Sequence, residues 1–142
     1  MTACIRGINR ELEKNKVAHE ILVIDDGSTD STQSVLTEIS REIPELVSLS
    51  NDGENGFGRA VRLGLREFSG DAVAIMMADL SDSPQDLVRY WKKLQEGHEC
   101  VFGSRFMPGS QVIDYPKAKL LANRVVNTAI RYAFKIPCND IT

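Results

Sequence analysis

The sequence has few cysteines, no net positive charge and no long apolar runs, and each of these features argues against a class of protein. Three cysteines in 142 residues, with no C-x-x-C spacing, predict neither a disulfide framework nor a zinc site. A formal net charge of -3 gives no overall basic field, so we expect no nucleic-acid partner. No apolar run approaches the ~20 residues that cross a bilayer, and no signal-peptide pattern opens the chain. We therefore expect a protein of the cytoplasm or of the cytoplasmic face of a membrane.

The composition is globular, but charge is unevenly distributed along the chain. Hydrophobic residues make up 42% and charged residues 26%, close to the average for a folded domain. Residues 1–114 contain 12 basic and 19 acidic side chains, net -7, whereas residues 115–142 contain 5 basic and 1 acidic, net +4. This contrast predicts an acidic core over 1–114 followed by a basic segment over 115–142.

Helical and strand-like patterns alternate along the first hundred residues. Apolar spacing predicts helices around 5–12, 32–41, 57–68 and 84–94, and continuous apolar runs predict strands at 20–25, 46–50, 72–77 and 100–103. Such alternation indicates an α/β fold with a largely parallel sheet, whose ligands bind at the carboxyl ends of the strands.

Carboxylates follow two of the expected strands. Asp25 and Asp26 precede a Gly-Ser-Thr turn and can accept hydrogen bonds from a ribose or a base N–H, although the same residues are common in turns and helix caps. Asp79 and Asp82 offer oxygen ligands for a hard cation that also binds a diphosphate. The alternative for Asp82 is that it caps the next helix together with Ser83.

A glycine-rich turn, NGFGRA at 55–60, opens the third helix. Its backbone N–H groups at Gly56 and Gly58 suit an anion. The turn lacks the Gly-Lys-Ser/Thr of a P-loop and the complete G-x-G-x-x-G of a dinucleotide-binding fold. The sequence therefore argues against both of these types of nucleotide-binding site.

Four segments in order resemble glycosyltransferase family 2, in the branch of dolichyl-phosphate mannosyltransferases and polyprenyl-phosphate sugar transferases. They are EILVIDDGSTD at 20–30, NGFGRA at 55–60 with Gly64, MADLSDSP at 77–84 and VFGSRF at 101–106. The resemblance implies a GT-A (Rossmann-like) fold, a nucleotide-sugar donor and a Mg²⁺ or Mn²⁺ ion. It assigns Asp25, Asp26, Gly56, Gly58 and Asp79 to the donor and Asp79 to the metal, and Asp82 supplies a second carboxylate nearby.

The sequence departs from the family pattern at one site residue and at both ends. Met77 stands where the family usually has the first Asp of Asp-x-Asp, and methionine is a poor ligand for a hard cation. The family strand before the first helix is missing, and the chain stops inside a motif that begins at Asn139. We therefore expect an incomplete domain whose exposed sheet edges favour a homo-oligomer.

Basic and apolar residues interleave from Lys117 to Lys135. Such a helix could lie on an anionic membrane surface or bind a lipid-linked phosphate, or it could simply pack its apolar face on the domain. The resemblance implies that Arg105 and Lys119, with Arg124 beside them, face the phosphate of a polyprenyl or dolichyl phosphate acceptor.

These features together predict an inverting transfer of a hexose from a nucleotide diphosphate sugar to polyprenyl or dolichyl phosphate, with Asp79 and Arg105 as the catalytic residues. A phosphate acceptor is already ionised near neutral pH and needs no general base. One alternative is a hydroxyl acceptor, which would need a base such as Asp114 or Asp140. Another is a noncatalytic nucleotide-binding domain, suggested by Met77.

Overall fold

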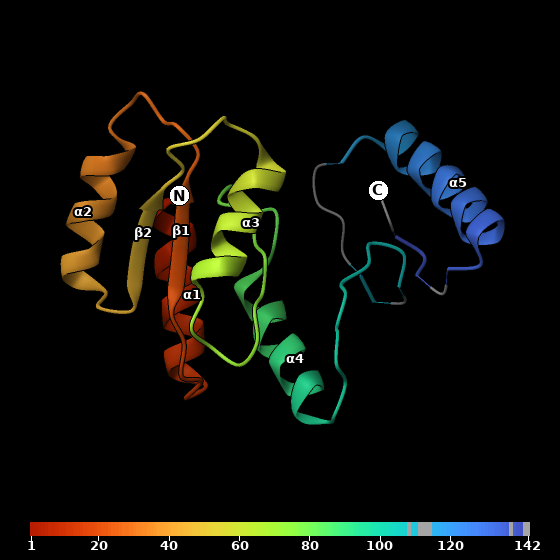
Figure 1. Ribbon diagram of the computed structural model, residues 1–142. Helices are drawn as coiled ribbons and strands as arrows, with labels where there is room; N and C mark the ends of the chain where they lie inside the picture. The colour runs from red at the N-terminus through yellow and green to blue at the C-terminus, as the bar shows by residue number, and fades with distance from the viewer. Residues whose placement is uncertain (108, 111–114, 137, 141–142) are drawn as a thin grey trace. The chain divides into compact units, whose positions relative to one another are not determined.

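The computed structural model describes residues 1–107, 109–110, 115–136 and 138–140 and divides the chain into two compact units, Met1–His98 and Glu99–Thr142. The boundary between the two packed units therefore lies earlier in the chain than the boundary after residue 114 that the charge distribution suggests. The latter boundary stays a prediction. Figure 1 shows the elements, which are α1 (Thr2–Lys14), β1 (Ile21–Asp25), α2 (Thr32–Glu42), β2 (Leu46–Ser50), α3 (Phe57–Glu67), α4 (Pro84–Gln95) and α5 (Lys117–Phe134).

The sheet of the first unit pairs β1 with β2 in parallel, among the residues that the structure describes. Ile21 lies opposite Leu46, and Asp25 lies opposite Ser50. Helix α2 makes the crossover that two parallel strands require. Both strands therefore end at the same edge of the sheet, which brings the turn after Asp25 next to the loop after Ser50.

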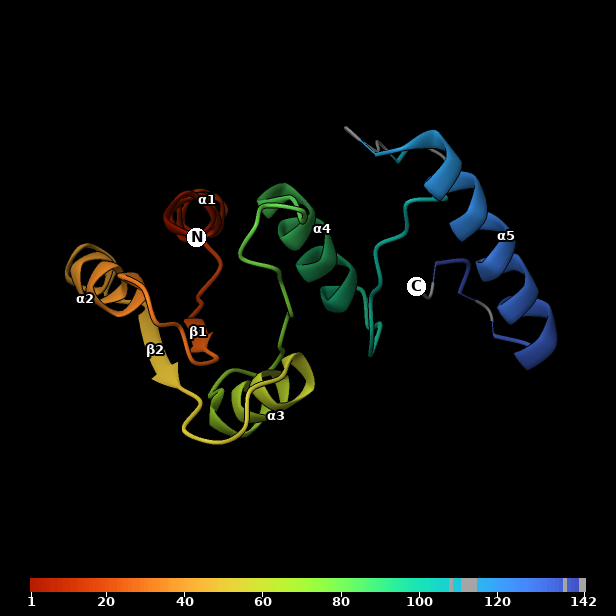
Figure 2. The same cartoon turned by 90° about the horizontal axis from the view of Figure 1, so that it is seen from above.

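Three helices, α1, α2 and α4, share one hydrophobic core on one face of this sheet (Figure 2). Helix α1 contributes side chains at helical spacing, which puts them on one face of the helix. The predicted helices over 5–12, 32–41 and 84–94 are confirmed. The buried residues of the core are Cys4, Ile5, Ile8, Leu12, Ile21, Leu36, Ile39, Ile43, Leu46 and Val88.

Helix α3 covers the opposite face of β1 (Figure 2). Successive side chains of a strand point to opposite faces, so Ile24 faces away from the core that holds Ile21. A Cβ built on Gly64 of α3 would lie 3.6 Å from Cγ1 of Ile24, an ordinary van der Waals contact. Alanine would therefore also fit here, and the contact shows that α3 packs against Ile24 of β1.

Two predicted strands, 72–77 and 100–103, are not strands in the structure. A strand exists only where a neighbour pairs with its backbone, and in the described part of the chain β1 pairs only with β2. The first segment accordingly leaves its apolar side chains half exposed, at 48% for Val73, 57% for Ile75 and 46% for Met77. The predictions of strands at 72–77 and 100–103 are therefore wrong for the described structure.

The second unit consists of α5 and a loop that returns to residues 138–140. Ser104 Oγ donates to Asn139 Oδ1 at 2.7 Å, and the backbone N–H of Arg105 donates to Asp140 Oδ2 at 2.8 Å. The helix expected over 117–135 is confirmed, and it ends at Lys135, whose φ of 52° is left-handed. The loop with Arg105 is therefore held by hydrogen bonds to a segment about 35 residues later in the chain.

Candidate functional site

Asp26 ties the turn after β1 to the glycine-rich start of α3. Its Oδ1 accepts a hydrogen bond from Asn51 Nδ2 and its Oδ2 accepts one from the backbone N–H of Gly56, both at 2.6 Å. The Asn51 amide and then the Gly56 N–H hold the pKa of Asp26 below its usual range. The structure thus joins two segments that the sequence assigns to the donor, and it uses the Gly56 N–H internally.

Gly27 makes the close approach of these two segments possible. Its φ of +85° lies in the left-handed region, and a Cβ there would lie 2.7 Å from Nδ2 of Asn55. Asp25 lies beside it, buried, and accepts a hydrogen bond from the Ser28 N–H at 3.0 Å. Gly58, by contrast, lies in the first turn of α3 with nothing within 4 Å of its built Cβ.

The two carboxylates proposed for the metal lie in one exposed turn before α4. Asp79 Oδ1 accepts a hydrogen bond from the Ser81 N–H at 2.9 Å, and Asp82 Oδ2 accepts one from the Met77 N–H at 3.1 Å. Hydrogen bonding by Ser81, through its side chain and then its backbone, keeps the pKa of Asp79 low. Carboxylate oxygens are the ligands that a hard cation prefers.

The donor set of this turn fits a divalent cation that takes its other ligands from a diphosphate. Each carboxylate uses one oxygen within the turn, at Ser81 or Met77, and has a second oxygen as donor. Within the described residues no group of three or more His, Cys, Asp or Glu side chains could hold a metal ion by itself.

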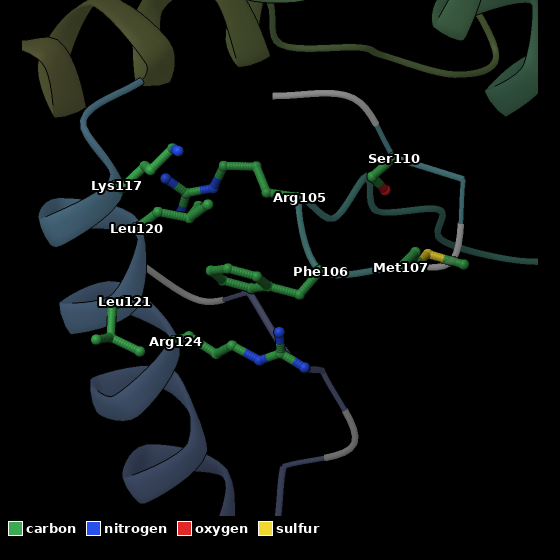
Figure 3. A pocket seen from close by; sticks show the side chains of 8 residues that line it. All are labelled: Arg105, Phe106, Met107, Ser110, Lys117, Leu120, Leu121 and Arg124. Carbon is green, nitrogen blue, oxygen red and sulfur yellow. The ribbon is translucent and has the colours of Figure 1, made fainter. Parts of the chain in front are cut away.

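A basic pocket of about 460 Å³ lies within the second unit (Figure 3). Its cationic side chains are Arg105, Lys117 and Arg124, and in the view of Figure 3 the ring of Phe106 lies between the two arginines. The remaining lining residues are mostly apolar, namely Phe106, Met107, Ser110, Leu120 and Leu121. The pocket thus combines positive charge with an apolar wall.

Two of the three residues predicted at the acceptor phosphate, Arg105 and Arg124, line this pocket, whereas Lys119 does not. Nζ of Lys119 instead lies 5.3 Å from the ring centre of Tyr115. Sequence reasoning placed Lys117 only among the basic residues of the segment and missed Tyr115. Lys117 could have been identified from its position, because it lies two residues before Lys119 at the start of α5.

The start of α5 is unusually positive for a helix N-terminus. Lys117 and Lys119 lie in its first turn, which contains no acidic residue. The N-terminal N–H groups already carry partial positive charge, so these lysines are unfavourable there unless an anion binds. Among the described residues, no carboxylate forms an ion pair with Lys117, Lys119 or Arg124. The arrangement suits an anionic ligand.

Arg105 is held by a bidentate ion pair with Asp140. Nε donates to Oδ2 at 2.9 Å and Nη2 donates to Oδ1 at 2.5 Å, and the Asp140 side chain is only 8% exposed. The Asp140 partner raises the pKa of Arg105, and the Arg105 side chain lowers the pKa of Asp140 against the opposing effect of burial. A carboxylate whose pKa is lowered and whose oxygens are bonded to an arginine is a weaker general base than an ordinary aspartate. Asp114, the other base considered, lies outside the described residues.

Comparisons with known proteins place the chain in one family. Residues 2–139 match the model of glycosyl transferase family 2. The chain is 33% identical over 128 residues to the polyprenol monophosphomannose synthase of Mycolicibacterium smegmatis, covering 86% of this chain and 48% of that protein. It is 31% identical over 120 residues to the dolichol-phosphate mannosyltransferase of Pyrococcus furiosus, covering 80% of this chain and 34% of that protein.

The chain therefore belongs to glycosyl transferase family 2. Its α/β architecture with parallel strands is consistent with part of a GT-A domain, as the sequence predicts. It spans between a third and a half of the length of the two relatives. In the described part of the chain, no helix is long and apolar enough to cross a membrane.

Proposed function

We propose that the protein transfers a hexose, with inversion, from a nucleotide diphosphate sugar to a polyprenyl or dolichyl phosphate. The observation that carries this proposal is the pocket of Arg105, Lys117 and Arg124, in which cations alternate with apolar side chains. A phosphate monoester on a hydrocarbon chain has this combination of charge and apolar surface. The names of the two relatives make mannose the first sugar to test.

The chemistry of this acceptor matches the groups that the chain offers. A phosphate monoester loses its second proton near pH ~6, so at neutral pH its oxygen can attack the anomeric carbon without a general base. That attack forms the new carbon–oxygen bond while the bond to the nucleoside diphosphate breaks. Arg105 and Arg124 would bind and orient the phosphate, as the fixed guanidinium of Arg105 allows.

The donor side of the proposal uses the acidic turns of the first unit. The turn of Asp25 and Asp26 with Gly56 and Gly58 would form the nucleotide-sugar site, in which the Gly56 N–H holds Asp26 in place, and Asp79 would lie at the diphosphate. Mg²⁺ or Mn²⁺ held by Asp79 and Asp82 would neutralise charge on the departing nucleoside diphosphate. The exposed carboxylate oxygens of this turn support the assignment.

Helix α5 is proposed to lie on the cytoplasmic surface of a membrane. Leu121, Val125 and Tyr132 are spaced for one face of the helix and are 65%, 61% and 79% exposed. An apolar face flanked by lysine and arginine is typical of helices that bind an anionic lipid surface. This placement would bring the pocket to the level of the acceptor phosphate groups.

The experiment that tests the proposed function is a donor panel with one acceptor. The intact protein is incubated with GDP-mannose, UDP-glucose and other nucleotide sugars, with polyprenyl phosphate and Mn²⁺, and the lipid fraction is analysed. We expect a lipid-linked sugar from one donor. Transfer only to soluble glycans would contradict the proposed acceptor.

A noncatalytic nucleotide-binding role is the second candidate, and Met77 is the observation that favours it. This side chain is 46% exposed at the start of the turn with Asp79 and cannot supply an oxygen ligand. If no donor turns over with the native protein or with Met77→Asp, while nucleotide still binds, this second function replaces the first.

A further inference from the structure

Two cations of the second unit converge on the ring of Tyr115. Cζ of Arg105 lies 5.9 Å and Nζ of Lys119 lies 5.3 Å from the ring centre. Both distances are within the ~6 Å over which a cation is attracted to the face of an aromatic ring. The phenol hydroxyl accepts a hydrogen bond from Asn123 Nδ2 at 2.9 Å, which fixes the ring to α5.

The two cations differ in what else holds them. Arg105 has Asp140 and the ring of Phe106, 5.7 Å away, in addition to Tyr115. Lys119 forms no ion pair with a carboxylate among the described residues, and its cation–π contact is with the Tyr115 ring. A lysine side chain has several rotatable bonds, and without such a contact it would sample many positions.

We propose that Tyr115 is a positioning residue that holds Arg105 and Lys119 together as one binding site for the acceptor phosphate. This inference rests on the proposed function, and it assigns a role to a residue that sequence reasoning missed. The ring reduces the repulsion between the two cations and keeps both near the pocket lined by Arg105. Lys119 thus contributes to the site although it does not line the pocket in the structure.

The test measures binding of farnesyl phosphate and of farnesol, its uncharged counterpart, by calorimetry. The native protein should bind the phosphate more tightly than the alcohol. Tyr115→Leu should weaken phosphate binding about five- to tenfold, because two cation–π contacts are lost. Tyr115→Phe keeps the ring and should stay within about twofold of the native value. Tyr90→Leu, at a tyrosine of α4 in the first unit, is the matched control and should leave phosphate binding unchanged.

A double-mutant cycle separates positioning from a merely structural role. If Tyr115 acts through Lys119, then Tyr115→Leu should cost much less in a Lys119→Gln background than in the native protein. The Asn123→Ala variant keeps the ring but removes the hydrogen bond that fixes it to α5, so it gives a second route if Tyr115→Leu fails to fold, and it should weaken phosphate binding about twofold.

Two results would overturn the inference, and they are distinguishable. Tight phosphate binding that is unchanged in Tyr115→Leu, or effects that multiply independently in the cycle, would refute the role of Tyr115 and leave the proposed acceptor standing. A native protein that binds farnesol and farnesyl phosphate equally would overturn the proposed acceptor and this inference with it.

Discussion

Arg105 and Asp140 form a bidentate ion pair, with Nε to Oδ2 at 2.9 Å and Nη2 to Oδ1 at 2.5 Å. Asp140 also accepts the backbone N–H of Arg105. The carboxylate therefore fixes both the side chain and the main chain of the residue that we place at the acceptor phosphate. A lysine at 105 could not reproduce this planar arrangement.

Replacing Asp140 by asparagine should destabilise the protein. The substitution removes a charge-assisted pair from a side chain that is 8% exposed, and we expect the free energy of unfolding to fall by about 1–3 kcal/mol. Urea denaturation measures this change. Asp86→Asn breaks the exposed pair of Asp86 with Arg89 and should cost no more than about 0.5 kcal/mol. Equal losses of unfolding free energy in the two variants would contradict a larger contribution from the Arg105–Asp140 pair.

The same pair predicts a pH dependence of stability. Arg105 lowers the pKa of Asp140 in the folded protein, so the unfolded state binds more protons as the pH falls. The contribution of the ion pair to the free energy of unfolding is complete at neutral pH. It is lost as the pH falls below the ordinary aspartate pKa of about 3.9 toward the lower pKa of Asp140 in the folded protein. Thermal unfolding measured from pH 7 to pH 3 should show that Asp140→Asn loses less stability on acidification than the native protein does. Parallel curves for the two proteins would contradict the assignment.

Gly27 and Gly58 should respond oppositely to alanine. Gly27→Ala places a Cβ at a φ of +85° and 2.7 Å from the Asn55 side chain, so we expect a loss of about 1–2 kcal/mol in the free energy of unfolding. Gly58→Ala fills open space in a helix and should gain about 0.5–1 kcal/mol. Denaturant titration of both variants checks the pair, and a stable Gly27→Ala would mean that the two loops do not pack closely.

The metal assignment predicts how nucleotide binding depends on Mn²⁺. Asp79→Asn should weaken Mn²⁺-dependent binding of the nucleotide sugar at least about tenfold, and Met77→Asp should strengthen it, because an oxygen ligand is lost or gained. Asp71→Asn, outside this turn, is the control. Isothermal titration at several Mn²⁺ concentrations measures both effects. An unchanged metal requirement in Asp82→Ala would remove Asp82 from the site.

Local patterns in the sequence were sufficient for the helices and for β1 and β2. Spacing of apolar residues such as Ile5, Ile8 and Leu12 defines α1 because a helix forms from contacts close in sequence. The segment 72–77 was predicted wrongly because a strand depends on a neighbour distant in sequence, which the apolar run of Val73 and Ile75 does not reveal.

The candidate site was predictable in part for the same reason. The family resemblance implied that Arg105 and Arg124 face the acceptor phosphate, and both line one pocket. The pairing of Arg105 with Asp140 joins residues 35 apart in sequence, and no local pattern encodes it. The contact of Lys119 with Tyr115 spans only four residues, so the spacing of these two residues was an available signal that sequence reasoning did not use.

The most direct test of the proposed function compares two acceptors that differ only in the phosphate. The intact protein is given radiolabelled nucleotide sugar, Mn²⁺ and either polyprenyl phosphate or polyprenol, and label in the lipid fraction is counted. The pocket of Arg105, Lys117 and Arg124 predicts transfer to polyprenyl phosphate and none to polyprenol. Label on polyprenol, or on neither lipid while a soluble glycan is labelled, would contradict the proposal.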